Sequence, residues 1–438
     1  MTHPPHRRSR FMSVSEPRRV LGAGDAALLG VGSMLGAGVF TVFGPAAASA
    51  GTWLLAAVLL AGAAAFMNAT STAQLAAQYP SAGGAFVYGR ERLGPWAGFV
   101  AGWGFVTGKT ASCAAMALVI AESLRAAGLV PDGWTRVAAA AAVIGVALLN
   151  LRGVTKTAGV TRVLVGLVLA GLGAVLLAAW LRGEPEPARA LPAGPLPVGG
   201  VLQAAGLMFF AFAGYARIAT LAAEVREPRR TIPRAVVTAL GFVVALYAVL
   251  AATLLAVLGP SRLAGAAAPL ALLAGAGAAD GPTTGALPVW IGLLGAVSAA
   301  GALLGLMAGL SRTGHAMAEA GELPRWIAPL DPRTGVPARA ELVFTGLIVA
   351  AVLLGDLRGV IGFSSFGVLV YYLVANLAAW TQSGADRIYP RWMQAAGAVC
   401  CAALAVSLPW EAVLGGAAVA AVGVGVRLAR LRAARTAA

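Results

Sequence analysis

An apolar stretch near the start of the chain reads GVGSMLGAGVF at residues 30–40, so that four glycines interrupt a potential membrane helix. A second apolar stretch, at residues 207–235, reads LMFFAFAGYARIATLAAEVREPRRTIPRA and contains Gly214 within its apolar half. In a bilayer, an unpaired backbone N–H or C=O group costs several kcal/mol, so an interrupted helix persists only where it lines a cavity or lies inside the protein. The two interruptions therefore predict the position of a binding site.

Helix packing is the alternative explanation for the first glycines, because Gly32 and Gly36 have the G-x-x-x-G spacing that lets two helices approach closely. Many transporters instead use a pair of discontinuous helices, whose free N–H ends attract an anionic group and whose free C=O ends attract a cationic group. An amino acid carries a carboxylate and an ammonium close together and suits such a pair. The sequence alone leaves both explanations open.

The regions around these two stretches are apolar along nearly the whole chain. Of the 438 residues, 59% are hydrophobic and 11% are charged, whereas soluble proteins carry about 25% charged residues. Apolar stretches of about 18 or more residues can each cross a bilayer as a helix. We therefore predict an all-α polytopic membrane protein with about twelve transmembrane helices in one membrane domain at 24–426. The expected spans are 24–47, 52–78, 96–124, 134–151, 158–181, 201–224, 235–258, 288–317, 340–355, 359–380, 392–408 and 410–426, with a loop at 183–200 and short joining segments that carry proline and charge, for example at 225–234 and 319–339.

Positive charge is distributed unevenly over the predicted segments outside the membrane. With the N-terminus in the cytoplasm, most of the 32 Lys and Arg residues fall on the cytoplasmic side, as the positive-inside rule requires. The net charge of +15 therefore indicates topology and contact with anionic lipid, and no nucleic-acid partner is expected. We predict a multi-pass protein of the plasma (inner) membrane with cytoplasmic tails at 1–23 and 427–438, in which Arg427 contacts the lipid surface.

Four blocks of sequence carry a resemblance to a known superfamily. They are GVGSMLGAGVF at 30–40, YPSAGGAFVYGRERLGPWAGFVAGW at 79–103, FFAFAGYARIATLAAEVREPRRTIPRA at 209–235 and SRTGHAMAEAGELPRWIAPLDPRTGVPARA at 311–340. In this order, the blocks resemble those of the amino acid–polyamine–organocation (APC) superfamily of permeases. The resemblance implies alternating access and a five-plus-five inverted repeat at about 24–181 and 201–380. It also implies discontinuous first and sixth helices and two extra C-terminal helices at about 392–426.

The same resemblance implies where a substrate binds. Backbone N–H groups after the first break would hold its carboxylate, and backbone C=O groups at both breaks would hold its ammonium. The implied residues are Gly36, Ala37 and Gly38 for the carboxylate, Met34, Phe210, Ala211 and Ala213 for the ammonium, and Phe210 and Tyr215 for the side-chain pocket, together with residues 105–110. Leu306 stands where some relatives have a gating tryptophan, so such a gate is not expected. Ordinary packing is the alternative role for Phe209, Phe210 and Phe212.

Two cations lie inside predicted spans, where an ionisable side chain is costly and indicates a functional role. Lys109 is far from both ends of the third span, and we expect a role in coupling, in which it either exchanges a proton during transport or holds the place that a sodium ion fills in other transporters. The alternative for Lys109 is a water-filled vestibule without coupling. Arg217 follows Gly214 by three residues and lies two helical turns before Glu224. It is a candidate for gating or for binding an acidic substrate, with a structural charge network as the alternative.

Two departures from the superfamily pattern narrow the expected function. Ala216 stands where some relatives that carry cationic amino acids have an acid, and Val168 stands where some proton-coupled relatives have a lysine. A cationic substrate is therefore disfavoured, and Lys109 is left as the membrane lysine for proton coupling. We expect secondary active transport of amino acids, preferably small or apolar neutral ones, with protons as the coupling ion and sodium as its alternative. An acidic substrate, a carrier or exchanger of polyamines or other organocations, and a non-transporting nutrient sensor remain alternatives.

Residues for catalysis or metal binding do not cluster in the sequence. His315 and Glu319 are four residues apart, but no third ligand accompanies them. We therefore expect no enzyme activity, no metal and no cofactor. Polar residues inside the spans are expected to form hydrogen bonds between helices. They are Asn68, Gln74, Asn150, Ser298 and Asn376.

Overall fold

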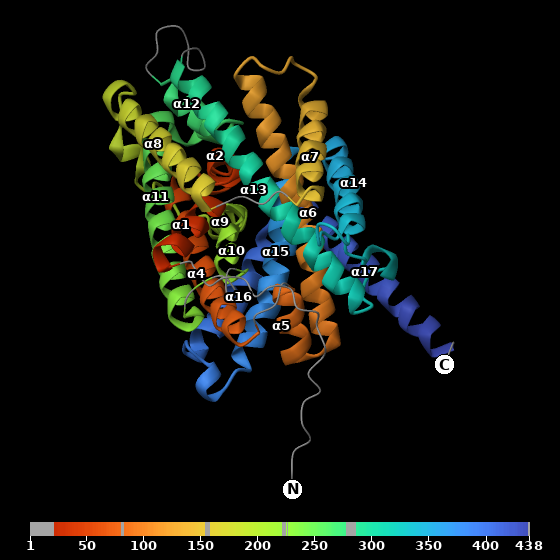
Figure 1. The fold of residues 1–438 in the computed structure, drawn as a ribbon. Coiled ribbons are helices and arrows are strands. Elements are labelled where there is room, and N and C mark those ends of the chain that lie inside the picture. The colour runs from red at the N-terminus through yellow and green to blue at the C-terminus, as the bar shows by residue number, and fades with distance from the viewer. Residues whose placement is uncertain are drawn as a thin grey trace.

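The computed structural model describes residues 22–79, 83–153, 158–220, 225, 227–276 and 286–436. Within these ranges every regular element is a helix, and each predicted span contains one or more helices (Figure 1). The α-helices are α1 (Ala23–Met34), α2 (Ala37–Thr41), α3 (Phe43–Ala50), α4 (Leu54–Gln78), α5 (Gly84–Leu93), α6 (Pro95–Ala126), α7 (Thr135–Leu151), α8 (Ala158–Arg182), α9 (Val198–Phe212), α10 (Ala216–Thr220), α11 (Pro228–Ala264), α12 (Pro269–Ala274), α13 (Ala286–Glu319), α14 (Ala338–Leu354), α15 (Leu357–Trp380), α16 (Arg391–Ser407) and α17 (Trp410–Thr436). Short 3₁₀ helices are η1 (Gly51–Trp53), η2 (Pro187–Ala190), η3 (Ala213–Tyr215), η5 (Arg325–Ile327) and η6 (Gly384–Asp386).

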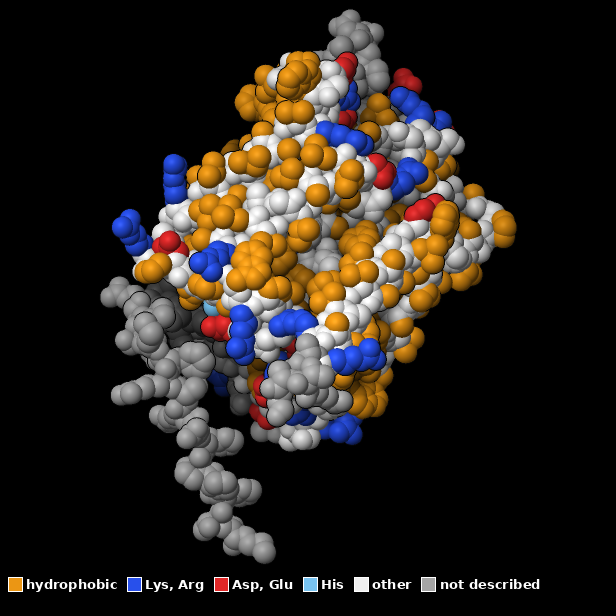
Figure 2. All heavy atoms as spheres, turned by 90° about the vertical axis from the view of Figure 1, so that its right-hand side faces the viewer, with side chains coloured by type: hydrophobic (Ala, Val, Ile, Leu, Met, Phe, Trp, Pro, Cys, Tyr) orange, Lys and Arg blue, Asp and Glu red, His pale blue; other side chains and the backbone are white. Residues whose placement is uncertain are grey.

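Nine helical regions within the described ranges are long and apolar enough to cross a membrane. The helices α7, α14 and α16 have 17 residues each, which corresponds to about 25 Å, slightly less than the usual hydrocarbon core. Apolar side chains cover most of the middle of one face, whereas Lys and Arg gather towards its lower part and upper edge (Figure 2). The prediction of an all-α polytopic membrane protein is confirmed.

Helices extend into three segments outside the expected spans. The segment 225–234 contains the start of α11, because proline is well tolerated at the first helical position, where the missing N–H has no intrahelical partner. The segment 183–200, expected as a loop, contains η2 and the first residues of α9. In the segment 427–438, α17 continues as far as Thr436, since its Ala, Leu and Arg residues are good helix formers. The expectation of a loop was wrong for these parts of 183–200.

The helix α6 lies at the centre of the bundle. It is the most deeply buried of the nine apolar regions, and it packs against α5, α7, α13 and α15. The helix α13 crosses the bundle obliquely, with α8 on one side and α6, α7 and α14 on the other (Figure 1). On the α8 side, α1 packs against α8 and α11. The cavity described below lies between α1, on the α8 side, and the pair α6 and α13.

A buried cluster of charges joins α17 to the rest of the bundle. The Nη2 atom of Arg427 lies 2.8 Å from Glu322 Oε1, and the Nη1 atom of Arg90, on α5, lies 3.3 Å from the same oxygen. Arg427 also donates to the Pro95 carbonyl oxygen at 3.0 Å, and its guanidinium lies over the Trp96 ring. The side chains of Arg427 and Glu322 are 7% and 8% exposed. Arg427 therefore packs inside the protein, and the expected lipid contact is wrong for this residue.

The two predicted interruptions are present in the structure. The helix α1 ends at Met34 and α2 begins at Ala37, so that Leu35 and Gly36 lie outside both helices. The helix α9 ends at Phe212, and the single turn η3 separates it from α10. The prediction of discontinuous first and sixth membrane helices is confirmed.

Two glycines allow the interruptions to contact each other. A Cβ atom on Gly38 would lie 2.5 Å from Ala211 Cα, and a Cβ atom on Gly214 would lie 2.3 Å from the Ser33 carbonyl oxygen. Neither distance leaves room for a side chain, so the two breaks approach backbone to backbone. Packing and interruption, the two explanations of the glycine-rich stretches, therefore both apply.

Candidate functional site

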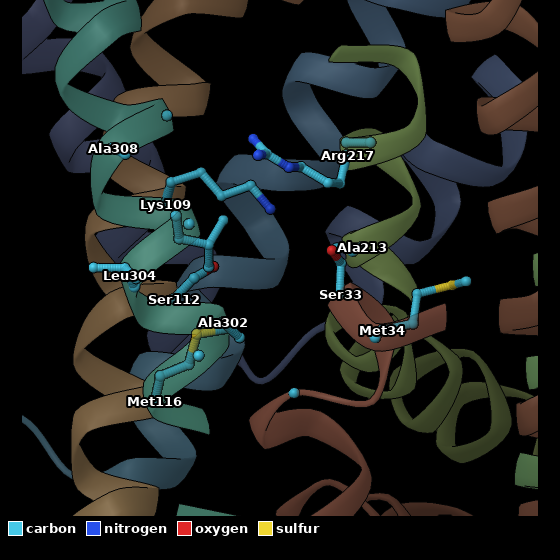
Figure 3. A pocket seen from close by; sticks show the side chains of 18 of the residues that line it. Ser33, Met34, Lys109, Ser112, Met116, Ala213, Arg217, Ala302, Leu304 and Ala308 are labelled. Carbon is cyan, nitrogen blue, oxygen red and sulfur yellow. The ribbon is translucent and has the colours of Figure 1, made fainter. Parts of the chain in front are cut away.

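The two breaks form one wall of a cavity with a volume of about 210 Å³. The helices α6 and α13 form the opposite wall (Figure 3). On α6, the cavity-lining residues Lys109, Ser112 and Met116 are spaced by three and four residues, which places them on one face of the helix. Arg217 extends into the cavity from α10, opposite Lys109 (Figure 3). The cavity thus lies between the wall that carries the breaks and a continuous helical wall.

Most residues predicted for the site line this cavity. They are Met34, Gly36, Gly38, Lys109, Phe210, Ala211, Ala213, Arg217 and Leu306. Ala37 is the first residue of α2 and supplies its backbone to the break, but its side chain is outside the described part. Tyr215 is 1% exposed and packs against Tyr372 with ring centroids 5.2 Å apart. Tyr215 therefore lies behind the cavity wall.

The carbonyl groups at the first break have partners within the protein. The Tyr247 hydroxyl, on α11, donates to the Met34 carbonyl oxygen at 2.7 Å and lies 3.4 Å from the Ala211 carbonyl oxygen. The Ser298 hydroxyl, on α13, donates to the Leu35 carbonyl oxygen at 2.7 Å. A carbonyl oxygen has two lone pairs and accepts up to two hydrogen bonds. These contacts stabilise the break while leaving each oxygen able to accept a further hydrogen bond.

The other side of the first break presents N–H groups. The helix α2 begins at Ala37, and the first N–H groups of a helix have no acceptor within that helix. Gly36 and Gly38 both line the cavity, so N–H groups at this position can donate to an anion placed there. One break therefore offers donors and acceptors within a few residues of each other.

Replacing Tyr247 by Phe should reduce the free energy of unfolding by about 1–3 kcal/mol, because a buried carbonyl oxygen loses its hydroxyl partner. The ring contacts of Tyr247 with Phe43 and Phe212 would remain. Denaturant unfolding of the purified protein in detergent measures the change. The matched control is Tyr389→Phe, in the segment between α15 and α16, where the hydroxyl has no such role. Equal losses in the two variants would contradict the stabilising role of Tyr247.

The cavity carries positive charge. Lys109 is 4% exposed, and its ammonium forms no ion pair with any residue in the described ranges. Arg217 and Arg312 also line the cavity, and the described part of the lining contains no aspartate or glutamate. Glu224, predicted to lie on the same side as Arg217, is outside the described residues. The charge of the described lining therefore favours a carboxylate over an ammonium.

Several polar residues at the cavity are not singled out by the sequence patterns. Ser33, Ser112, Thr161 and Arg312 line it. Asn150 also lines it, and its Nδ2 atom donates to Glu341 Oε1 at 2.9 Å, which confirms the predicted interhelical hydrogen bond. The sequence does contain a signal for Glu341, since this acid lies within the predicted span 340–355.

A cavity between discontinuous helices, inside a bundle of apolar helices, defines a multi-pass membrane transporter. The comparison with known families agrees, because the family model described as amino acid permease matches residues 21–423. The chain belongs to the amino acid permease family, and its resemblance to the APC superfamily is confirmed.

Three relatives illustrate the range of this family. An uncharacterised transporter of Mycobacterium tuberculosis is 49% identical over 425 residues, which cover 96% of this chain and 94% of the relative. A cationic amino acid transporter of Arabidopsis thaliana, named as chloroplastic, is 28% identical over 84% of this chain and 66% of its own length. A branched-chain amino acid permease of Bacillus subtilis is 26% identical over 82% of this chain and 80% of its own length. The chain is similar to these transporters along most of its length.

Proposed function

We propose that this protein is a secondary active transporter that moves amino acids across the plasma membrane by alternating access, with protons as the coupling ion. The observation that supports this function best is the cavity at the meeting point of the two helix breaks, which combines backbone donors, backbone acceptors and buried Lys109. The segments 24–181 and 201–380 would form the inverted repeat of the transporter, and 392–426 the two additional helices.

The backbone at the breaks would bind the part that all amino acids share. The N–H groups of Gly36, Ala37 and Gly38 would hold the carboxylate, since helix N-terminal groups favour anions. The carbonyl groups of Met34, Phe210, Ala211 and Ala213 would receive the ammonium. The side chains of Phe210 and Leu306 would contact the substrate side chain, while Tyr215 would support this wall from behind.

The charge of the cavity bears on the class of amino acid. Lys109, Arg217 and Arg312 line the cavity without an acidic residue in its described lining, so a substrate with an additional cationic group would be repelled. We therefore favour neutral amino acids over the cationic amino acids named for the Arabidopsis thaliana relative. A branched-chain substrate, as named for the Bacillus subtilis permease, fits this charge. The same repulsion disfavours polyamines and other organocations.

The uneven distribution of Lys and Arg supports an orientation with both termini in the cytoplasm. In that orientation Leu29 of α1, Thr161 of α8 and Arg312 of α13 would lie towards the cytoplasm. All three line the cavity. We propose that the cavity faces the cytoplasm in this conformation, so that movement of α1 and α10 against α6 and α13 would close it.

Uptake into proteoliposomes tests this function. A panel of radiolabelled amino acids and putrescine would be offered with and without an inward proton gradient, to the intact protein and to Lys109→Ala. We expect one class of amino acid to accumulate only with the gradient, and this accumulation to collapse in Lys109→Ala, because this buried ammonium lines the cavity in which the substrate would bind. Thr110→Ala is the matched control, since Thr110 neighbours Lys109 and its hydroxyl bonds within α6.

The alternative outcomes separate the parts of the proposal. Accumulation that is independent of the proton gradient in both proteins would show that protons are not the coupling ion. It would also contradict a role of Lys109 in the coupling step. Absence of uptake and of binding for every amine, in protein that is demonstrably folded, would overturn the substrate class.

A further inference from the structure

Glu341 of α14 is a buried acid immediately behind the cavity wall. Its side chain is 1% exposed, and it lies in the first turn of a helix that packs against α6, α7 and α13. Its Oε1 atom accepts a hydrogen bond from Asn150 Nδ2 at 2.9 Å. Its Oε2 atom has no hydrogen-bond partner among the residues that the structure describes. One oxygen of this carboxyl group is therefore hydrogen-bonded, and the other has no geometric hydrogen bond within the described part.

Among the residues that the structure describes, no cation forms an ion pair with Glu341. The groups that face it are the amide of Asn150 from α7, the hydroxyl of Ser311 from α13 and the thiol of Cys113 from α6. None of these groups is positively charged. Basic residues do occur on the described elements packed against α14, on α14 itself and just beyond the end of α7, but none of them is paired with Glu341. They are Lys109, Arg125, Arg136, Arg152, Arg312, His315, Arg325 and Arg339.

An ionised carboxylate at such a place is unfavourable, because burial removes its hydration, and the Asn150 amide and the neighbouring Ser311 hydroxyl replace only part of it. The N-terminal end of α14 supplies partial positive charge, which offsets only part of this cost. Binding a proton removes the charge altogether. Glu341 is thus a group that can take up a proton within the membrane part of the protein.

A single side chain connects this acid to the cavity. Asn150 lines the cavity, and its Nδ2 atom lies 2.9 Å from Glu341 Oε1 and 3.4 Å from the carbonyl oxygen of Leu304, which lines the cavity as well. On the same wall, Cys113 lies within electrostatic range of both Lys109 and Glu341. A change of charge or hydration in the cavity therefore reaches Glu341 through one residue.

We propose that Glu341 binds the proton that drives transport and that Asn150 connects its carboxyl group to the cavity. The inference rests on the proposed function, because it names the coupling site of that transporter. A hydronium ion in the cavity breaks one O–H bond and becomes water, the proton forms an O–H bond on Oε2, and the carboxylate becomes a neutral acid. Asn150 is a positioning residue, which holds Oε1 and leaves Oε2 for the proton. In this proposal Glu341 binds the driving proton, and Lys109 contributes to the coupling step from the cavity wall.

The variant Glu341→Gln tests the proposal, because glutamine keeps the shape of the side chain and an acceptor for Asn150 but cannot exchange a proton. Two assays in proteoliposomes are compared: accumulation driven by a proton gradient, and exchange of labelled against unlabelled substrate without a gradient. We expect Glu341→Gln to retain exchange and to lose accumulation, so that internal substrate only equilibrates. The control is Glu411→Gln, which also changes a first-turn glutamate but on the exposed start of α17.

The possible results distinguish this inference from the proposed function. Accumulation by Glu341→Gln equal to that of the unchanged protein would overturn the role of Glu341, as would gradient-independent transport by the unchanged protein, which still leaves an amino acid permease. Failure of the unchanged protein to transport any amino acid would refute the function itself.

Infrared spectroscopy provides a readout that does not depend on transport. The chain has 17 Asp and Glu residues, so the contribution of one acid is isolated as a difference spectrum between proteins at each pH. We expect the C=O stretch of a protonated carboxylic acid to rise equally, as the pH falls, in the unchanged protein and in Glu411→Gln apart from the exposed Glu411 itself, and the component that belongs to a buried acid to be missing from Glu341→Gln. If Glu341→Gln does not fold, Glu341→Asp replaces it and should retain both accumulation and the infrared band. Absence of a band with this pH dependence from the unchanged protein would overturn the proposal.

Discussion

Replacing Gly214 by Ala should abolish transport, although the change adds a single methyl group. The new Cβ atom would lie 2.3 Å from the Ser33 carbonyl oxygen, 2.4 Å from the Ser33 carbonyl carbon and 2.6 Å from the Met34 backbone nitrogen. These are main-chain atoms at the end of α1, and they cannot rotate out of the way as a side chain can. Overpacking usually costs about 1–3 kcal/mol, and we expect the upper part of this range here. The two breaks would be pushed apart, and the donors and acceptors at the cavity would lose their spacing.

Uptake in proteoliposomes and thermal unfolding in detergent measure this effect. Gly38→Ala should behave in the same way, because its Cβ atom would lie 2.5 Å from Ala211 Cα. The matched control is Gly241→Ala on α11, where an added Cβ meets nothing within 4 Å. That control should transport normally. If Gly214→Ala transports as well as Gly241→Ala does, the close approach of the breaks is not required for function.

Replacing Glu322 by Ala should lower the free energy of unfolding by about 3–5 kcal/mol, the usual cost of removing one partner from a buried ion pair. The substitution would leave the guanidinium of Arg427, which is 7% exposed, facing Arg90 without an intervening carboxylate. Both the lost attraction and the uncompensated buried charge favour unfolding. Because Arg427 holds α17 and Arg90 holds α5, detachment of α17 from α5 and α6 should accompany the loss. Denaturant unfolding followed by circular dichroism measures the change.

Two further variants test whether the loss of stability arises because the ion pair is buried. Glu186→Ala removes an acid whose ion pair with Arg189 is exposed on both sides, and exposed pairs contribute about 0–1 kcal/mol. The double variant Glu322→Leu with Arg427→Met replaces both charges by apolar groups and should recover much of the lost stability. A loss for Glu322→Ala no larger than that for Glu186→Ala would contradict the role of the buried cluster.

The membrane helices and their interruptions could be predicted from the sequence, because both depend on local properties. Long apolar runs cross the bilayer wherever they occur, and glycines mark the places where a helix can leave its regular path. A polar residue inside an apolar span also predicts a hydrogen bond to a neighbouring helix. Asn376, for example, donates to Asn68 at 2.6 Å between α15 and α4. These features need no knowledge of which helices become neighbours.

Features that depend on neighbouring helices could not be predicted. Tyr247 and Ser298 satisfy the carbonyl groups of the first break from positions 213 and 263 residues further along the chain. The sequence predicts an interhelical hydrogen bond for Ser298 but not its partner at the break, and Tyr247 is one aromatic residue among many in apolar spans. Arg427 resembles the other basic residues at the C-terminus, and only its position beside Glu322 separates it from them. Tyr215 is a residue type that is common in binding pockets, but in η3 its ring packs against Tyr372.

The contacts of α1 with η3 and of α2 with α9 assign two parts of substrate recognition to the two walls of the cavity. Gly38 against Ala211, and Gly214 against Ser33, hold the two breaks at a fixed distance. Under the proposed function the backbone of this wall binds the main-chain part of an amino acid, which is the same for every substrate. The opposite wall, α6 and α13, is then the part that differs between one substrate and the next. A lineage with this architecture can acquire a new substrate range by substitutions on α6 and α13, while selection keeps the glycines of the other wall unchanged.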